Sequence, residues 1–141
     1  MNKLYRSAIS TFLIILIIVS CRKDKIDSAG NIYNQWEVAD IMSVESVLYT
    51  KNNNFNPIIQ FYKNGSISLK LDANNCIGDF ILSGNGGIKI ILSGCTEICC
   101  DSDFSEKIQQ TLSLVDSYEI DKNKMKLNVP GWGWINLKLH N

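Results

Sequence analysis

The amino-acid sequence predicts an α+β domain that is mostly β: a curved antiparallel sheet or small open barrel of about eight strands, with one helix at about residues 103–114. Two observations support this fold class. From residue 35 onward, short segments of alternating apolar residues follow one another, separated by tight turns such as Asn64-Gly65. Only the stretch after residue 102 carries apolar residues at helical intervals. Short strands joined by tight turns form antiparallel, strongly curved sheets.

Residues 1–20 have the pattern of a secretory signal peptide. Two basic residues precede an almost wholly apolar run at residues 11–19, which is shorter than the about 20 residues that span a bilayer. Residues 18–21, Ile-Val-Ser-Cys, resemble a bacterial lipobox, in which the cysteine, here Cys21, receives diacylglycerol before cleavage. The alternative is an uncleaved N-terminal anchor with an incidental cysteine. We expect lipidation at Cys21.

Cleavage at this point divides the chain into three parts: the signal peptide (1–20), a lipidated N-terminus with a polar tether (21–34) and the domain (35–141). The signal peptide holds two of the 14 basic residues and none of the 14 acidic ones, which leaves 12 basic and 14 acidic residues. The resulting formal charge of about −2, without a basic stripe, does not favour nucleic-acid binding. We expect a bacterial cell-envelope protein, held by the lipid on Cys21 in the outer membrane and facing the periplasm.

Alternation of apolar and polar residues defines the expected strands. In the first of them, Trp36 and Val38 should point inward. Asn64-Gly65 supplies the positive φ angles of a tight hairpin turn, and the glycine-rich residues 83–87 mark a second reversal. We expect strands at residues 35–41, 47–49, 58–62, 66–71, 79–82, 88–92, 118–120, 125–129 and 132–139.

The single expected helix follows the last cysteines. Asp103 and Glu106 have the spacing of a capping box, in which the first residue caps the helix and the second bonds back to it. One apolar stripe at helical spacing comprises Phe104, Ile108, Leu112 and Val115. The pattern therefore predicts a helix that covers the open face or mouth of the sheet.

Four cysteines of the expected domain, Cys76, Cys95, Cys99 and Cys100, lie close together in the sequence. They allow three full pairings, among which the sequence does not choose. An exported chain meets an oxidising compartment, so we expect disulfides, with Cys76 joined to Cys99 or Cys100 and Cys95 to the other one. A zinc site is the alternative, but only Cys95 and Cys99 have the spacing of a zinc knuckle. We predict no metal, no cofactor and no catalytic residue.

Several positions follow the order of a known family pattern. A tryptophan opens the domain, an Asn-x-x-x-Gly-x-aromatic segment follows the first hairpin, and a Thr-x-x-x-Cys segment precedes the helix. The residues at these positions are Trp36, Asn74, Gly78, Phe80, Thr96 and Cys100. On these residues, the domain at about residues 35–139 resembles the META/HslJ-like domain of bacterial envelope proteins.

The resemblance implies a small β-rich domain, frequently lipid-anchored, that is linked with envelope stress and robustness and has no catalytic residues. The sequence departs from the family pattern in two places. The usual Gly-Cys before the asparagine is Asp72-Ala73 here, and the cysteine comes two residues after the asparagine, at Cys76. The doublet at residues 99–100 is additional.

Trp132 and Trp134 are two residues apart and should therefore share one face of the last strand. If the rings point outward, they form a candidate binding platform for a sugar, a peptide or a lipid chain. If they point inward, they belong to the core, which is the interpretation we favour.

Three functions compete. The first is a non-enzymatic, lipid-anchored envelope protein that binds or stabilises an unknown envelope protein. The second is a lipocalin-like carrier of a small apolar ligand, which needs an internal cavity. The third is a thiol- or metal-dependent enzyme, which needs reactive cysteines beside a cleft. The carrier has no room if the interior is filled by Phe61, Ile67, Leu69, Ile81, Ile90 and Leu137. We favour the first function.

Overall fold

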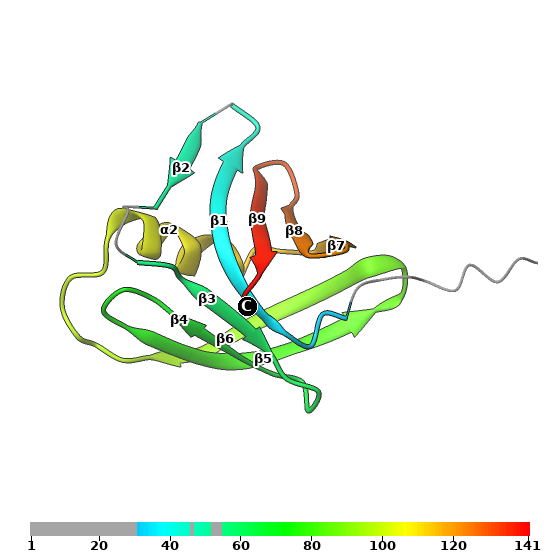
Figure 1. The fold of residues 1–141 in the computed structure, drawn as a ribbon, viewed down its shortest axis with the longest axis horizontal. Coiled ribbons are helices and arrows are strands. Elements are labelled where there is room, and N and C mark those ends of the chain that lie inside the picture. Colours follow the sequence, from blue (N-terminus) through cyan, green and yellow to red (C-terminus); the bar gives the residue numbers. More distant parts are fainter. Residues whose placement is uncertain (1–30, 46, 52–54) are drawn as a thin grey trace, which may run out of the picture.

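The computed structural model describes residues 31–45, 47–51 and 55–141. The predicted signal peptide, Cys21 and most of the predicted tether lie outside the described residues. Within the described part, nine strands, one 3-10 turn and one α-helix form the domain (Figure 1). In chain order they are β1 (Gln35–Ser43), β2 (Leu48–Thr50), β3 (Ile58–Phe61), β4 (Ser66–Lys70), β5 (Asn75–Ser83), η1 (Gly84–Gly86), β6 (Gly87–Cys95), α2 (Asp103–Leu112), β7 (Ser117–Asp121), β8 (Lys124–Val129) and β9 (Gly133–Leu139).

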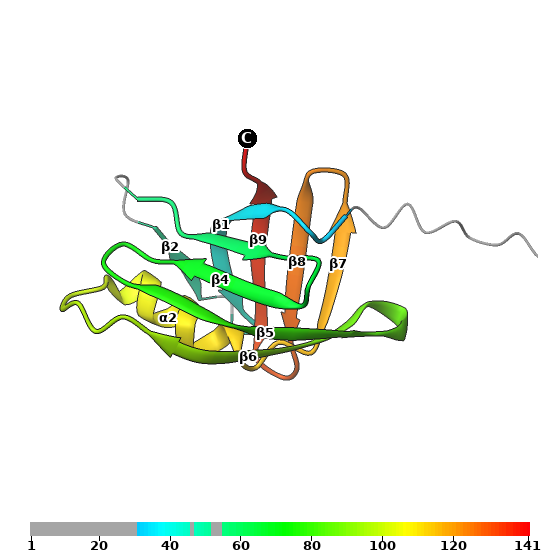
Figure 2. The ribbon, with the colours of Figure 1, turned by 90° about the horizontal axis from the view of Figure 1, so that it is seen from below.

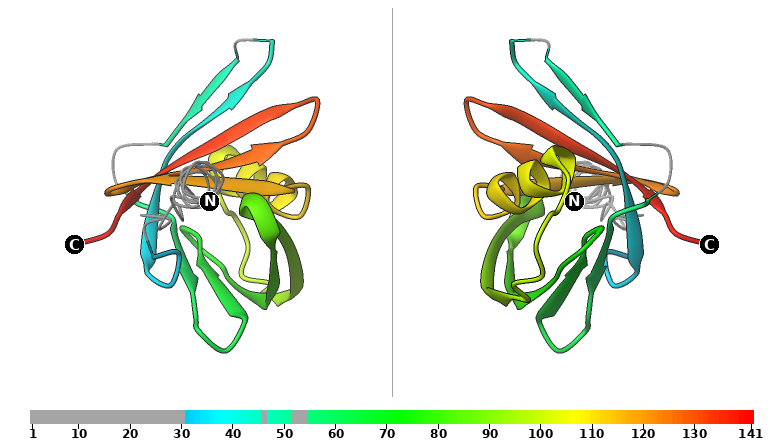
Figure 3. Two further views of the ribbon diagram at one scale, coloured as in Figure 1. Left: turned by 90° about the vertical axis from the view of Figure 1, so that its right-hand side faces the viewer. Right: turned by 90° about the vertical axis from the view of Figure 1, so that its left-hand side faces the viewer.

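All nine strands belong to one antiparallel sheet, in the order β2-β1-β3-β4-β5-β6-β7-β8-β9. This confirms the predicted mostly-β fold, a curved antiparallel sheet with one helix. β1 also pairs with β9 along almost its whole length, so the first and last long strands lie side by side and the sheet curls round on itself (Figures 2 and 3). The β1–β9 pairing joins residues about 100 positions apart, which no local sequence pattern records.

The hairpin turns follow from local residues. Gly65 has a φ of +88°, which an L side chain rarely adopts, and the Asn64 side chain accepts a hydrogen bond from the Ser66 amide at 3.0 Å. The predicted reversal at residues 83–87 contains η1, with Asn85 at a φ of +61°. Turn chemistry therefore sets the β3–β4 and β5–β6 pairings.

The core lies inside the curled sheet, as the period-two pattern predicts. In β4 the two buried residues, Ile67 and Leu69, alternate with polar residues, and Trp36 and Val38 of β1 are also buried. The largest fully buried side chains are Trp36, Ile41, Ile59, Phe61, Ile67, Leu69, Leu71, Ile108, Leu112, Met125, Leu127 and Ile135. Of the side chains expected inside, Ile81 is an exception, because its outward position on β5 leaves it 61% exposed.

The helix α2 lies against the sheet through its apolar stripe, with Phe104, Ile108 and Leu112 buried. Its N-cap is Ser102, whose hydroxyl accepts from the Ser105 amide at 3.3 Å. The expected capping box is therefore wrong by one residue: Asp103 is the first helical residue, where its charge favours the helix dipole. No helix among the described residues is long and apolar enough to cross a membrane.

The pairing of β6 is irregular on both of its edges. A bulge interrupts the β5–β6 register between Ile77 and Gly78, where the two backbones approach closely. On its other edge, β6 pairs with β7 only through Gly87 and Ser117. The chain between β6 and β7 forms α2 instead, and the helix occupies the place beside β6 where a longer ladder would run (Figure 3).

Candidate functional site

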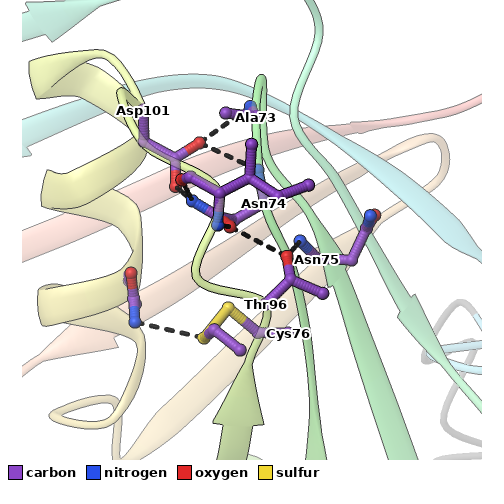
Figure 4. Close-up of a disulfide and its surroundings, with 9 residues drawn as sticks. Ala73, Asn74, Asn75, Cys76, Thr96 and Asp101 are labelled. Atoms are coloured by element: carbon purple, nitrogen blue, oxygen red, sulfur yellow. Dashed lines mark hydrogen bonds between the residues drawn. A yellow bond between two sulfur atoms is a disulfide. The ribbon is translucent and has the colours of Figure 1, made fainter.

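The four domain cysteines and the motif residues around Asn74 lie at one end of the β5–β6 hairpin. Figure 4 shows the Cys76 disulfide and the hydrogen bonds around Asn74. The turn before β5 contributes residues 72–75, and the loop between β6 and α2 contributes residues 96–102. We call these two segments together the Asn74 clamp. They lie more than 20 residues apart in sequence and are held against each other by nine side-chain hydrogen bonds.

The Asn74 amide is the centre of the clamp and is 8% exposed. Its nitrogen donates to the Ile98 carbonyl and to the Asp101 carboxylate, both at 2.7 Å. Its oxygen accepts from the Thr96 hydroxyl and from the Ile98 amide, both at 2.8 Å. All the hydrogen-bonding capacity of this side chain is therefore used inside the protein. Only an amide offers two donors and two acceptors in this arrangement.

Two aspartates each accept hydrogen bonds from the backbone of the opposite segment. The Asp101 carboxylate accepts hydrogen bonds from the backbone N–H of Ala73 at 2.8 Å and from the backbone N–H of Asn74 at 3.1 Å. The Asp72 carboxylate in turn accepts from the Ser102 amide at 3.0 Å, at the start of α2. Partial burial raises the pKa of Asp72, but the nearby hydroxyls of Ser105 and Ser102 and the Ser102 amide outweigh burial and hold the pKa well below its ordinary value of 3.8. The carboxylate is thus charged where the helix dipole stabilises it.

A disulfide joins Cys76 to Cys95 at the base of the clamp. The two residues are direct partners in the β5–β6 register, and Cys76 is completely buried. The expected bridge from Cys76 to Cys99 or Cys100 is therefore wrong: the register, which depends on the bulge at Gly78, brings Cys95 opposite Cys76. With a separation of 19 residues, the bridge contributes on the order of 3 kcal/mol to stability.

Cys99 and Cys100 form a second disulfide, between neighbours in the chain. Both are exposed, and Cys100 has a φ of +84°, in the left-handed region. The clamp holds the loop on each side of this pair, at Ile98 and at Asp101. The prediction that all four cysteines form disulfides thus agrees with the structure, but each member of the doublet pairs with the other rather than with a distant cysteine.

The remaining motif positions are packing positions. Trp36 is 1% exposed and donates from its indole nitrogen to the Ile32 carbonyl at 2.9 Å. The ring of Phe80 meets Phe61 edge-on, with centroids 5.1 Å apart. Gly78 lies where a Cβ atom would sit 2.1 Å from the Ile91 carbonyl oxygen. These residues stabilise the sheet.

Trp132 and Trp134 do not form one platform, because β9 begins at Gly133 and Trp132 lies in the preceding turn. Trp132 stacks on Tyr49 at a centroid distance of 6.4 Å, and the Lys107 ammonium lies 5.8 Å from its centroid. Trp134 is covered separately by the Lys126 ammonium at 4.5 Å. Each ring is half-buried and already meets a cation of this chain.

A second charged group, around Glu37, was not found from the sequence. The Glu37 side chain is 7% exposed and accepts from Lys51, while the Lys138 ammonium lies 3.2 Å away and His140 Nδ1 3.9 Å away. Burial raises the pKa of the Glu37 carboxyl, but the hydrogen bonds and charges of Lys51 and Lys138 outweigh burial and lower it below 4.5. This group ties β9 and the loop after β2 to β1.

Glu37 should make the stability depend on pH. A carboxyl with a lowered pKa in the folded state stabilises that state above the unfolded pKa, and loses this effect as the pH falls through the folded pKa. We expect Glu37→Gln to reduce the free energy of unfolding by about 2 kcal/mol at neutral pH, and by progressively less as the pH falls below 4.5 and through the lowered pKa of Glu37. Urea unfolding of both forms across this pH range tests this.

The control for this measurement is Glu45→Gln, at an exposed carboxylate in the turn after β1. It should change the stability little. A Glu37→Gln effect that is the same at acid and neutral pH would mean that the carboxylate charge contributes nothing.

No protein-family model and no curated protein matches this chain. Among solved structures, the crystal structure of a DUF4847 family protein from Bacteroides vulgatus is similar, with a TM-score of 0.60 and 14% sequence identity. The match covers 78% of this chain and 94% of that one. At this identity, the similarity concerns the fold alone: a mostly-β domain in which one antiparallel sheet is accompanied by a helix.

Proposed function

We propose that this chain is a lipid-anchored, non-enzymatic protein of the bacterial cell envelope that binds or stabilises an envelope partner. The lipid on Cys21 attaches it to the outer membrane, and the domain faces the periplasm. A role in envelope stress and robustness, as the resemblance to META/HslJ-like domains implies, belongs to the same proposal. The export signal and the lipobox are its sequence support.

The observation that carries the proposal is the closed hydrogen bonding of the Asn74 clamp. The polar side chains that look most like a site are bonded to one another and to the backbone, and so support the loop rather than face a substrate. Two disulfides beside the clamp suit an oxidising compartment such as the periplasm. Because its disulfides restrict its conformation, a domain of this kind is suited to presenting one fixed surface to a binding partner.

The packing of the interior favours this function over the lipocalin-like carrier. A carrier needs an internal cavity of ligand size. Here the side chains of Phe61, Leu69 and Leu137 that point into the curled sheet are at most 2% exposed and pack in one continuous core. Three grooves among the described residues lie on the outside of the sheet or beside α2.

The test is lipidation of the full-length protein expressed in a bacterium with two membranes. Cells are fed an alkyne-tagged fatty acid, and the protein is followed by its label and by membrane fractionation. We expect wild-type protein to be labelled and found with the outer membrane, and Cys21→Ser to lose the label and the membrane association. Cys99→Ser, which keeps the lipobox, is the matched control. Labelling of Cys21→Ser, or wild-type protein without label, would refute the lipid anchor.

A further inference from the structure

The Cys99–Cys100 disulfide is the more accessible of the two disulfides. Both of its residues are exposed. In the other disulfide, Cys76 is 0% exposed, and the Cys95 sulfur accepts a hydrogen bond from the Gln109 amide at 3.1 Å. Thiol–disulfide exchange begins when a thiolate attacks one sulfur of the bond, so its rate depends on access to that sulfur. An external thiol can therefore reach the Cys99–Cys100 disulfide, whereas the fold covers the other one.

The backbone at this exposed disulfide is strained and is held in place from both sides. Cys100 has a φ of +84°, a region that residues with a Cβ atom adopt uncommonly. The Asn74 side chain bonds to the amide and carbonyl of Ile98 on one side and to the Asp101 carboxylate on the other. Strained backbone of this kind persists where the surrounding structure imposes it, and it is concentrated at functional sites. The Asn74 clamp therefore holds an accessible disulfide on a strained segment at the surface.

The surroundings of this disulfide are negatively charged. Residues 93–106 contain no lysine or arginine and four acids, which are Glu97, Asp101, Asp103 and Glu106. Across the clamp, the hydrogen bonds of Asp72 keep its carboxylate charged. Two lysines border this region: Lys51, which lines a groove with Asp72 and binds Glu37, and Lys70 at the end of β4. Because the acids outnumber the lysines, the local potential repels an anionic thiol and attracts a cationic one.

We propose that the Cys99–Cys100 disulfide is a thiol–disulfide exchange site, which accepts two electrons from a dithiol whose reactive thiol lies in positively charged surroundings. The proposal goes beyond the proposed function, because it assigns a covalent reaction to the loop before α2. It does not depend on the lipid anchor. The reaction is stoichiometric, so it needs no catalytic residue in this chain.

The exchange takes place in two steps. A thiolate of the dithiol first attacks one sulfur of the Cys99–Cys100 disulfide and forms a mixed disulfide with it. The bond between the two cysteines breaks, and its electron pair leaves on the other sulfur, which takes up a proton. The second thiol of the reductant then loses its proton and attacks the reductant's own sulfur in the mixed disulfide. The protein leaves with two thiols, and the dithiol has become a disulfide.

The first test compares the two disulfides of the oxidised full chain, purified in detergent. The protein is treated with limiting dithiothreitol and quenched with N-ethylmaleimide, and mass spectrometry with fragmentation locates the labelled cysteines. We expect labelling of Cys99 and Cys100 at least about tenfold faster than labelling of Cys76 and Cys95, because only the first pair is accessible. Equal rates, or free thiols at residues 99 and 100 in the exported protein before treatment, would overturn the proposal.

A variant that carries both Cys99→Ser and Cys100→Ser is the control for this measurement. It keeps the Cys76–Cys95 disulfide and should remain unlabelled over the time in which the wild type reacts. Labelling of this variant at the rate of the wild type would show that the covered disulfide is the reactive one, which contradicts the assignment.

The second test concerns charge and uses two monothiols at equal thiolate concentration. Cysteamine, which carries an ammonium group, should react with the Cys99–Cys100 disulfide about threefold faster than 2-mercaptoethanesulfonate at low ionic strength, and the difference should vanish near about 1 M salt. Glu97→Lys should reduce this preference. Asp121→Lys, at an exposed position in β7, is the matched control and should keep it. Equal rates for the two thiols at low salt would refute the requirement for positive surroundings.

Discussion

Replacement of Asn74 by alanine should lower the free energy of unfolding by about 4 kcal/mol. The substitution removes four hydrogen bonds and leaves the Ile98 amide and the Thr96 hydroxyl without their acceptor. Each polar group left unsatisfied in a buried site costs about 1–3 kcal/mol, and a loss above about 4 kcal/mol is rare for a single mutation. Urea unfolding of the oxidised protein measures the change, and hydrogen exchange of the Ile98 amide should become faster.

The neighbouring Asn75 provides the matched control, since its exposed side chain makes no hydrogen bond within the described residues while its backbone amide bonds to Thr96. Asn75→Ala should change the stability by less than about 0.5 kcal/mol. If both alanine variants lose the same stability, the Asn74 side chain is not the element that holds the clamp together. If only Asn74→Ala lowers the free energy of unfolding, the loss comes from the side-chain hydrogen bonds of Asn74, because both variants keep the Cys76–Cys95 disulfide.

Gly78→Ala should destabilise the protein by about 3 kcal/mol. A Cβ atom at this position would lie 2.1 Å from the Ile91 carbonyl oxygen and 2.8 Å from the Leu92 Cα atom, and both are backbone atoms that a rotamer change cannot move. The β5 and β6 strands would have to separate at the bulge, next to the register that pairs Cys76 with Cys95. Thermal unfolding of the oxidised variant measures the effect.

Gly94, on β6 across the same bulge, is the control for the effect of a methyl group as such. A Cβ atom there meets nothing within 4 Å, so Gly94→Ala should leave the stability within about 1 kcal/mol of the wild type. Equal melting temperatures for the two variants would show that the close approach of β5 and β6 at Gly78 does not constrain the sheet. Comparison of the two variants thus separates the steric clash at Gly78 from the general effect of replacing a glycine by alanine.

The motif residues acquire a common physical meaning in the structure. Asn74 and Thr96 join the two segments of the clamp, Gly78 permits the bulge, and Trp36 and Phe80 fill the core. All of these roles are structural. A binding function therefore belongs to the outer surface of the domain rather than to the motif residues.

Local sequence signals were enough to predict the class of fold and most of its elements. Alternation in β4 and the Asn64-Gly65 turn are local signals, because a strand buries every second residue and a tight hairpin needs positive φ. The apolar stripe of α2 is equally local, and it placed the helix within two residues of its observed end at Leu112. The clustering of four cysteines also indicated where the cross-links would form.

The features that depend on strand register and sheet closure could not be predicted from the sequence, because they are set by long-range contacts. The bulge at Gly78 brings Cys95 opposite Cys76, and the inward or outward direction of Ile81 follows from the same register. The pairing of β1 with β9 and the charged group around Glu37 join residues about 100 positions apart. The alternation of apolar and polar residues shows which residues share one face of a strand. These contacts depend instead on the register between neighbouring strands and on where the sheet closes on itself.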